Sequence, residues 1–293
     1  MQFIKISIVL PVYNSVNFIE ETLISIFNQE YPNLELIVLD SCSTDGTTEV
    51  LKKYSSKIDQ LIIEKDNGQY YAVKKGLEIA SGEVIAWINA DDKYFPWTFS
   101  FVNKIFSSYN DVNWISGIPS YMNDQGEIYG MNNTIPTRPT NFIKNGWFRN
   151  KLFGYLQQEG MFWRKTVYDE IDGIDINYKL AADFDLWTRM ANNAELISVG
   201  ISLAIFRVHQ NSRSKVFIQE YENEVSRIVS LKQKAPFIYR VLFKIHPYLN
   251  AVLRKMIWKK SKIYYFSLKD RKWKLDNKLT SISQHPISHI MLK

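Results

Sequence analysis

The sequence predicts an α/β fold in which helices cover both faces of a mostly parallel central sheet. Between residues 3 and 92, short runs rich in Ile, Val and Leu alternate with segments that show helical periodicity. Acidic residues follow three of these apolar runs. Alternating strands and helices build parallel sheets, whose ligands bind beside the carboxyl ends of the strands. The same pattern therefore predicts both the fold and the edge of the sheet where a site lies.

The first half of the chain contains four predicted strands joined by three helices. The sequence from Pro11 to Asn14 breaks the first strand, and the following helix repeats apolar residues at helical spacing through Ile26. We expect strands at residues 3–10, 34–39, 61–63 and 84–88, and helices from Ser15, from Ser43 or Thr44 to Tyr54, and up to Ala80.

After residue 92 the alternation of strands and helices is less regular. An Asn-Asp-Gln-Gly sequence predicts a hairpin at residues 121–129, and residues 136–150 carry the Pro, Gly and Asn typical of a loop. The other expected elements are a helix at 96–108, strands at 114–117 and 157–163, a short helix to Ile171, a helix at 183–192 and one long final strand at 196–206.

The charge of the chain divides it into an acidic body and a basic end. The 293 residues include 36 Lys and Arg and 30 Asp and Glu. Residues 221–293 hold 16 of the bases and 4 of the acids, which leaves 20 and 26 for residues 1–220, or balances of +12 and −6. We therefore expect one domain at 1–220 and a basic, mostly helical extension at 221–293, with helical segments at 235–250 and 251–266.

The composition is that of a globular protein, with 46% apolar and 14% aromatic residues. The single cysteine, Cys42, excludes an intrachain disulfide. No uncharged apolar run approaches the roughly 18 residues that a membrane-spanning helix needs. We therefore expect that this chain is not an integral membrane protein.

Several segments, taken in order, resemble family 2 glycosyltransferases. They are SIVLPVYN, ISIFNQEYPNLELIVLD, SCSTDGT, EKDNGQYYAVKKGLEIASGEVIAWINADD, LAADFDLWTRMA and LAIFRVHQNS, within residues 4–214. The resemblance implies a GT-A fold, a nucleotide-diphospho-sugar donor, a Mg²⁺ or Mn²⁺ ion and inversion at the anomeric carbon. The C-terminal extension lies outside it.

The resemblance assigns the donor site to residues at the strand ends. Asp91 and Asp92 match the family's DXD-type motif, with one carboxylate on the metal and the other near ribose; carboxylates are suitable ligands for such an ion. Which of the two binds the metal stays open. Asp40 matches a contact to the nucleotide base, although Ser41 and Cys42 depart from the common pattern, and we interpret Cys42 as a small buried filler. The remaining donor residues implied by the resemblance are Pro11, Tyr13, Asn14 and Asp66.

The second half of the chain supplies the expected chemistry. Asp183 matches the family's catalytic acid residue and is the expected general base, which takes the proton of the acceptor hydroxyl. Asp185 is an acceptor contact or a structural partner of Arg189. Arg207 is expected to face the diphosphate, and His209 to bind the metal or a phosphate. Gln158 resembles an acceptor-side position.

The composition of the basic extension suggests that it binds an anionic surface. Bases interleaved with aromatic residues favour an anionic membrane surface over nucleic acid, since the body is acidic and no nucleic-acid module is present. We therefore expect a peripheral enzyme at the cytoplasmic face of the cell membrane, with a saccharide or lipid-linked acceptor, that builds a surface polysaccharide or glycolipid.

A catalytically silent sugar-nucleotide-binding protein and a sugar nucleotidyltransferase remain alternative functions for the chain. A dinucleotide oxidoreductase is disfavoured because no G-x-G-x-x-G follows the first strand.

Overall fold

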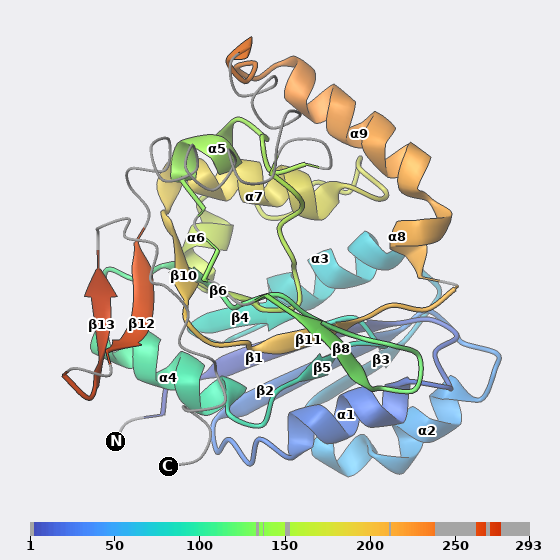
Figure 1. Ribbon diagram of the computed structural model, residues 1–293. Coiled ribbons are helices and arrows are strands. Elements are labelled where there is room, and N and C mark those ends of the chain that lie inside the picture. Colours follow the sequence, from blue (N-terminus) through green and yellow to red (C-terminus); the bar gives the residue numbers. More distant parts are fainter. Residues whose placement is uncertain are drawn as a thin grey trace.

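The computed structural model describes residues 3–132, 135–136, 138–149, 153–210, 212–237, 262–267 and 270–276. Within them, nine strands form a mixed central sheet (Figure 1). From one edge to the other, the order is β13 (Lys272–Asp276), β12 (Ile263–Ser267), β10 (Leu196–Val199), β6 (Trp114–Ser116), β9 (Met161–Arg164), β4 (Val84–Trp87), β1 (Ile6–Val12), β2 (Leu34–Asp40) and β3 (Gln60–Ile63).

The N-terminal part of the sheet is parallel, as the sequence predicts. β1 lies between β2 and β4, and β3 continues the same direction. In the register, Val12 lies opposite Asp40 and Asp40 lies opposite Ile63. The carboxyl ends of these strands therefore meet at one edge, where the loops that follow them carry the predicted donor residues.

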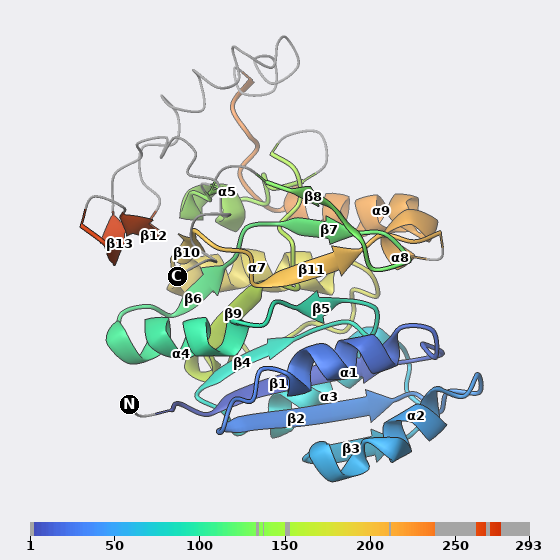
Figure 2. The same ribbon diagram turned by 60° about the horizontal axis from the view of Figure 1, so that its bottom comes forward.

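Helices cover both faces of the sheet (Figures 1 and 2). α1 (Ile19–Phe27), α2 (Thr47–Lys53) and α4 (Thr98–Ser108) lie on one face; α3 (Gln69–Ile79), α6 (Lys165–Asp169) and α7 (Ala182–Asn193) lie on the other. Neighbouring side chains of a strand point to opposite faces. In β9, accordingly, Phe162 contacts Phe99 of α4, and Trp163 contacts Trp187 of α7.

Four buried tryptophans fix α7 on the sheet. The ring of Trp187 stacks on Trp87 of β4 at 5.5 Å and 8°, and on Trp114 of β6 at 5.5 Å and 25°. Trp163 meets it edge-on at 5.3 Å. Because Asp183 lies four residues before Trp187, it lies on the same side of the helix, one turn nearer the start. Packing of these rings thus determines where the predicted base lies.

A second sheet has the order β5 (Lys93–Tyr94), β11 (Ala204–Arg207), β7 (Ser120–Met122), β8 (Ile128–Met131). β7 and β8 form the predicted hairpin. The prediction of one strand over 196–206 is wrong: β10 belongs to the central sheet and β11 to the second. The chain changes sheets at Gly200, where a Cβ would lie 2.9 Å from Ile135 and 3.4 Å from the carbonyl oxygen of Tyr264.

Three local elements differ from those expected. The helix expected from Ser43 or Thr44 begins at Thr47, after Gly46, which has a φ of 101°. A short 3-10 helix (Ser55–Lys57) follows it. Residues expected to form a loop contain α5 (Thr140–Lys144), whose Phe142 and Ile143 are buried. Tertiary packing of these apolar side chains overrides the loop signals around them.

The C-terminal segment contains strands as well as helices. After α8 (Arg213–Val216), helix α9 (Ile218–Ser230) crosses the predicted boundary at residue 220. The expected helix at 251–266 is wrong where the structure describes it, because Ile263–Ser267 is β12, which pairs in parallel with β10. Residues 238–261, which hold most of both expected helices, lie outside the described residues. Among the described helices, none is both long and apolar enough to cross a membrane.

Candidate active site

Asp91 and His209 lie together at the carboxyl end of β4. The Nε2 atom of His209 is 2.9 Å from Oδ2 of Asp91, and both side chains remain partly exposed. The ring of His209 also packs against Phe18, at the start of α1, with ring centroids 5.0 Å apart. Two of the predicted metal ligands, far apart in the sequence, are therefore adjacent.

Asp92 differs from its neighbour because it is fully buried. Its Oδ1 accepts a hydrogen bond from the backbone N–H of Arg207 at 2.8 Å, and its Oδ2 accepts one from Asn89 at 3.0 Å. Burial, followed by the charges of Asp91 and Glu159, raises the pKa of Asp92 well above its usual range. Of the aspartate pair, Asp91 is therefore the residue placed to meet a ligand, and Asp92 holds β11 against the loop.

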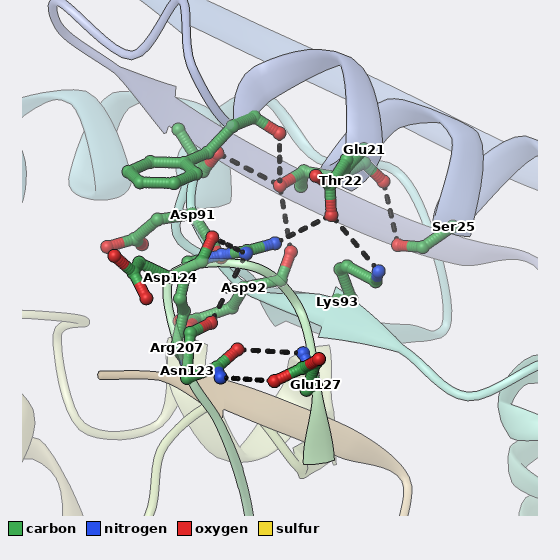
Figure 3. Close-up of polar contacts among 12 residues, drawn as sticks. Glu21, Thr22, Ser25, Asp91, Asp92, Lys93, Asn123, Asp124, Glu127 and Arg207 are labelled. Carbon is green, nitrogen blue, oxygen red and sulfur yellow. Dashed lines mark hydrogen bonds and ion pairs between the residues drawn. The ribbon is translucent and has the colours of Figure 1, made fainter. Parts of the chain in front are cut away.

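Arg207 is also buried, which differs from the expectation that it faces a diphosphate. Its guanidinium donates to the carbonyl oxygens of Asp91 and Asp124 and to the carboxylate of Glu21, at 2.8, 2.9 and 2.8 Å (Figure 3). These bonds turn the guanidinium toward protein groups on three sides. The side chain acts on the site through the backbone of Asp91.

The loop after β1 is open at its tip. Tyr13 is 62% exposed, so its ring is available to a ligand, whereas Pro11 is buried within β1 and belongs to the core. Asn14 adopts a φ of 46° and joins this loop to the one after β2: its N–H donates to Ser43 Oγ, and its Oδ1 accepts from the N–H of Thr44.

Asp40 is buried, and its two carboxylate oxygens have partners in the loop that follows it and in the first turn of α2. Ser43 donates from its N–H and its hydroxyl to Oδ1, and Thr48 donates to Oδ2. The Asp40 carboxylate thus fixes the conformation of this loop, whereas the family resemblance implied that it contacts the nucleotide base. Cys42 in the same loop is exposed, with a φ of 55°, so its interpretation as a buried filler is wrong. Asp66 is partly exposed beside this loop, and its N–H donates to Ser41 Oγ.

Asp183 lies at the start of α7, and the pKa of its carboxyl group is raised. Burial raises its pKa to about 6, although the hydrogen bond donated by the N–H of Phe184 and the nearby hydroxyl of Tyr70 act in the opposite direction. A carboxyl with a pKa near 6 is a stronger base than an ordinary aspartate, and it is ionised at neutral pH. These properties suit a general base.

The first residues of α3 connect Asp183 to the Asp91 loop. Gln69 Nε2 donates to Asn89 Oδ1 at 2.6 Å, while the hydroxyl of the next residue, Tyr70, donates to the carbonyl oxygen of Leu180 at 3.1 Å. Because these two neighbours reach both segments, the predicted donor and base residues border one site.

Glu224 of α9 holds the segment that leads into α7. Its carboxylate accepts the backbone N–H groups of Lys179, Leu180 and Ala181 at 3.0, 2.9 and 2.8 Å. Its charge also contributes to the raised pKa of Asp183. A residue beyond position 220 therefore takes part in building the site.

Two predicted acceptor-side residues have structural partners. Gln158 is buried, and its amide donates to the carbonyl oxygen of Trp87. Asp185 accepts a hydrogen bond from Arg189 Nε at 2.6 Å, as the structural alternative for this residue predicted.

Glu159 is a site residue that the sequence reasoning missed. It is 5% exposed, and its Oε2 has no hydrogen-bond partner among the residues that the structure describes. Burial, together with the charges of Asp91 and Asp183, raises its pKa to about 8, so both predicted functional groups act on it. The available signal in the sequence was an acidic residue inside the strand expected at 157–163.

The donor atoms around Asp91 fit a divalent ion bound together with a diphosphate. Within the described part of the chain, no three His, Cys, Asp or Glu side chains come together as a metal site. Such ions commonly take one or two protein ligands and complete their shell with water and substrate phosphates. Asp91 and His209 match that pattern.

Comparison with known proteins identifies the family. The model of the family described as "Glycosyl transferase family 2" matches residues 7–170. The chain belongs to glycosyl transferase family 2. Among its relatives, a Bacillus subtilis protein named for teichuronic acid biosynthesis, TuaG, is 40% identical over 93 residues, 30% of this chain and 36% of that protein. Glycosyltransferase GlyA of Streptococcus pneumoniae is 34% identical over 263 residues, 86% of this chain but only 37% of its own length.

Solved structures confirm the GT-A fold of this family 2 member. S. aureus TarS 1–349 in complex with UDP-GlcNAc aligns with a TM-score of 0.60 and 17% identity, covering 86% of this chain and 75% of that one. The mannosyltransferase PcManGT from Pyrobaculum calidifontis, in complex with GDP-Man and Mn²⁺, aligns with a TM-score of 0.57 and 20% identity, covering 85% and 71%.

Proposed function

We propose that the protein is an inverting glycosyltransferase that moves a sugar from a nucleotide-diphospho-sugar to an acceptor hydroxyl. One observation carries the proposal within the family assignment: α3 joins the partly exposed Asp91 loop to the segment that leads into Asp183, whose pKa is raised to about 6. One end of this site suits a diphosphate and its ion, and the other suits removal of a proton. Inverting transfer requires both.

In the proposed mechanism, each residue has one task. Tyr13 packs on the nucleotide, and Asp91 with His209 would hold the ion that accompanies the diphosphate. That ion, when bound, neutralises the phosphates and stabilises the leaving group. Asp183 accepts the proton of the acceptor hydroxyl as this oxygen attacks the anomeric carbon from the side opposite the diphosphate. The N–H of Phe184 holds the Asp183 carboxylate in place, and the hydroxyl of Tyr70 holds the carbonyl of Leu180 in the segment that leads into α7.

The substrate class is proposed from the relatives. Neighbouring structures were solved with UDP, UDP-GlcNAc and GDP-Man, which supports a nucleotide-sugar donor. The likeness to TuaG supports a role in building a cell-surface polysaccharide. We propose a saccharide or lipid-linked acceptor for that pathway.

A nucleotide screen tests the proposed function. Calorimetry with UDP, GDP, ADP and CDP, each with Mn²⁺ and with a chelator, is expected to show one base bound clearly better than the others, and only with the ion. The matching sugar nucleotide should then be hydrolysed slowly or transferred to a surface-polysaccharide acceptor. Binding of no nucleotide by the folded protein would remove the proposal, and binding without hydrolysis or transfer would favour a silent binding protein.

We also propose that the enzyme works at the cytoplasmic face of the cell membrane and contacts anionic lipid through residues 238–261. This segment has six Lys and Arg and no acidic residue. Neutralising Arg254, Lys255, Lys259 and Lys260 with Gln should weaken binding to phosphatidylglycerol vesicles by at least about tenfold, since each base near such a surface contributes about 1 kcal/mol. Sedimentation with vesicles measures this.

The control carries the same charge change on the body. Lys52, Lys57, Lys104 and Lys144 are exposed and lie outside the extension. Equal losses in the two quadruple variants would mean that net charge alone determines vesicle binding, and the membrane assignment of residues 238–261 would fail.

A further inference from the structure

An ionic cluster around the buried Arg207 lies beneath the Asp91 loop, and its other members are partly exposed (Figure 3). We define the Arg207 cluster as Arg207, Glu21 and Lys93. Glu21 Oε2 accepts hydrogen bonds from Arg207 Nη2 at 2.8 Å and from Lys93 Nζ at 3.1 Å. Burial disfavours the charge of Glu21, but the bonds from Arg207 and Lys93 outweigh it, so the pKa of Glu21 is lowered. The carboxylate is therefore the counterion of a fully buried guanidinium.

Arg207 joins three segments that are distant in the sequence. α1 supplies Glu21, and also the ring of Phe18, whose centroid is 4.7 Å from the guanidinium carbon. The loop after β4 supplies the carbonyl oxygen of Asp91, and the β7–β8 hairpin supplies that of Asp124. A planar guanidinium with five donors in fixed directions can hold three such segments at once.

The contacts of Arg207 and His209 determine the position of Asp91. Arg207 holds the backbone carbonyl of Asp91 and His209 holds its carboxylate. Both Arg207 and His209 pack on Phe18. If the guanidinium moved, the carbonyl oxygen of Asp91 would lose its hydrogen bond to Arg207, and the orientation of the Asp91 carboxylate would change.

The turn of the hairpin lies close to the same cluster. Gly126 has a φ of 82°, and a Cβ on it would lie 3.4 Å from Glu21 Oε2 and 3.6 Å from Arg207 Nη1. Asn123 closes the turn by accepting the N–H groups of Gly126 and Glu127, at 3.1 and 2.9 Å. The hairpin is thus held against the Asp91 loop by Arg207 and by the fit of its glycine.

We propose that Arg207, with Glu21 as its counterion, is a positioning residue that orients Asp91 toward the donor's ion and holds the β7–β8 hairpin against the donor site. The proposal rests on the proposed function for its ligand. It assigns to Glu21 a role in the donor site, although Glu21 itself need not touch the donor.

A pair of neighbouring glutamates on α1 provides the test. Glu21→Gln keeps the size of the side chain and removes the counterion of Arg207. Glu20→Gln is the matched control, because Glu20 pairs at the surface with Lys53 and Tyr54, away from the cluster. We expect Glu21→Gln to weaken nucleotide binding about tenfold with Mn²⁺ and less than about twofold with a chelator, while Glu20→Gln changes neither. These magnitudes follow the 10–100-fold cost of removing residues that orient metal ligands.

The dependence on the ion separates positioning from general destabilisation. Equal weakening with and without Mn²⁺, or no weakening, would overturn the role in orienting Asp91. Arg207→Lys, which keeps the charge but loses the three-way contact, should behave like Glu21→Gln.

A second measurement needs no nucleotide. Amide hydrogen exchange of residues 120–131 should be faster in Glu21→Gln and unchanged in Glu20→Gln, because the hairpin loses its anchor. Unchanged exchange in Glu21→Gln would overturn the hairpin part of the proposal. If the wild type binds no nucleotide, the proposed function fails, and with it the role of Arg207 toward the donor; hydrogen exchange then still decides whether the cluster holds the hairpin.

Discussion

Asp91→Asn is expected to weaken Mn²⁺-dependent nucleotide binding by at least about 100-fold. Removing residues that only support metal ligands costs 10–100-fold in metal affinity or activity, and Asp91 is the direct ligand in the proposed site. Asparagine keeps the shape of the side chain and a polar contact to His209, so the fold should persist. Titration calorimetry with the nucleotide selected by the screen, with and without Mn²⁺, measures the loss.

Asp169→Asn is the matched control for Asp91→Asn. Asp169 is an exposed aspartate that pairs with Lys165 on α6 and has no place in the proposed site. It should bind nucleotide like the wild type. An Asp91→Asn protein with unchanged Mn²⁺-dependent affinity would show that the ion, if used, binds elsewhere.

Asp183→Asn should reduce kcat by about 10²- to 10⁴-fold, the usual contribution of a general base. The amide can still accept the N–H of Phe184, so α7 should keep its start. Nucleotide affinity should stay within about twofold, because Asp183 lies on the acceptor side of the proposed site. Initial rates at saturating donor, with calorimetry on the same protein, separate the two effects. Loss of nucleotide binding together with kcat would mean that Asp183 supports the donor site instead.

The raised pKa of Asp183, about 6, also predicts the shape of the pH profile. The base acts as a carboxylate, so protonation at lower pH removes activity. We expect kcat to fall about tenfold per pH unit below about 6 and to be level above it. In Asp183→Asn this fall should disappear. A wild-type kcat that does not change between pH 5 and 7 would exclude Asp183 as the group that limits the rate.

The parallel half of the fold could be predicted because its signals are local. Short apolar strands, helical periodicity and polar strand ends all lie within residues 3–92, and each signal indicates the same βαβ order. The strand break at Gly200 could not be predicted in this way. The apolar run from 196 to 206 looks continuous, and only the two separate sheets show that the chain turns there.

The site residues show the same difference between local sequence signals and contacts that form only in the fold. The strand-end position of Asp91 was evident from the sequence, as was the helix start that carries Asp183. The roles of Asp40, Asp92 and Arg207 depend on which group each one contacts, and Glu21 lies 186 residues from Arg207. A motif gives the position of a charged residue in the chain, but it does not show whether the charge faces a ligand or is used within the protein.

The pairing of β12 with β10 holds the chain that follows the basic segment against the folded body. Lys262 bonds to Glu195 beside this pair, and on the other side the described chain runs through α9 to Phe237. The 24 residues from 238 to 261 therefore start from and return to the folded body. An acceptor or lipid bound between these two attachment points would be tethered to the folded body, which raises its effective concentration for a second contact with the same protein molecule.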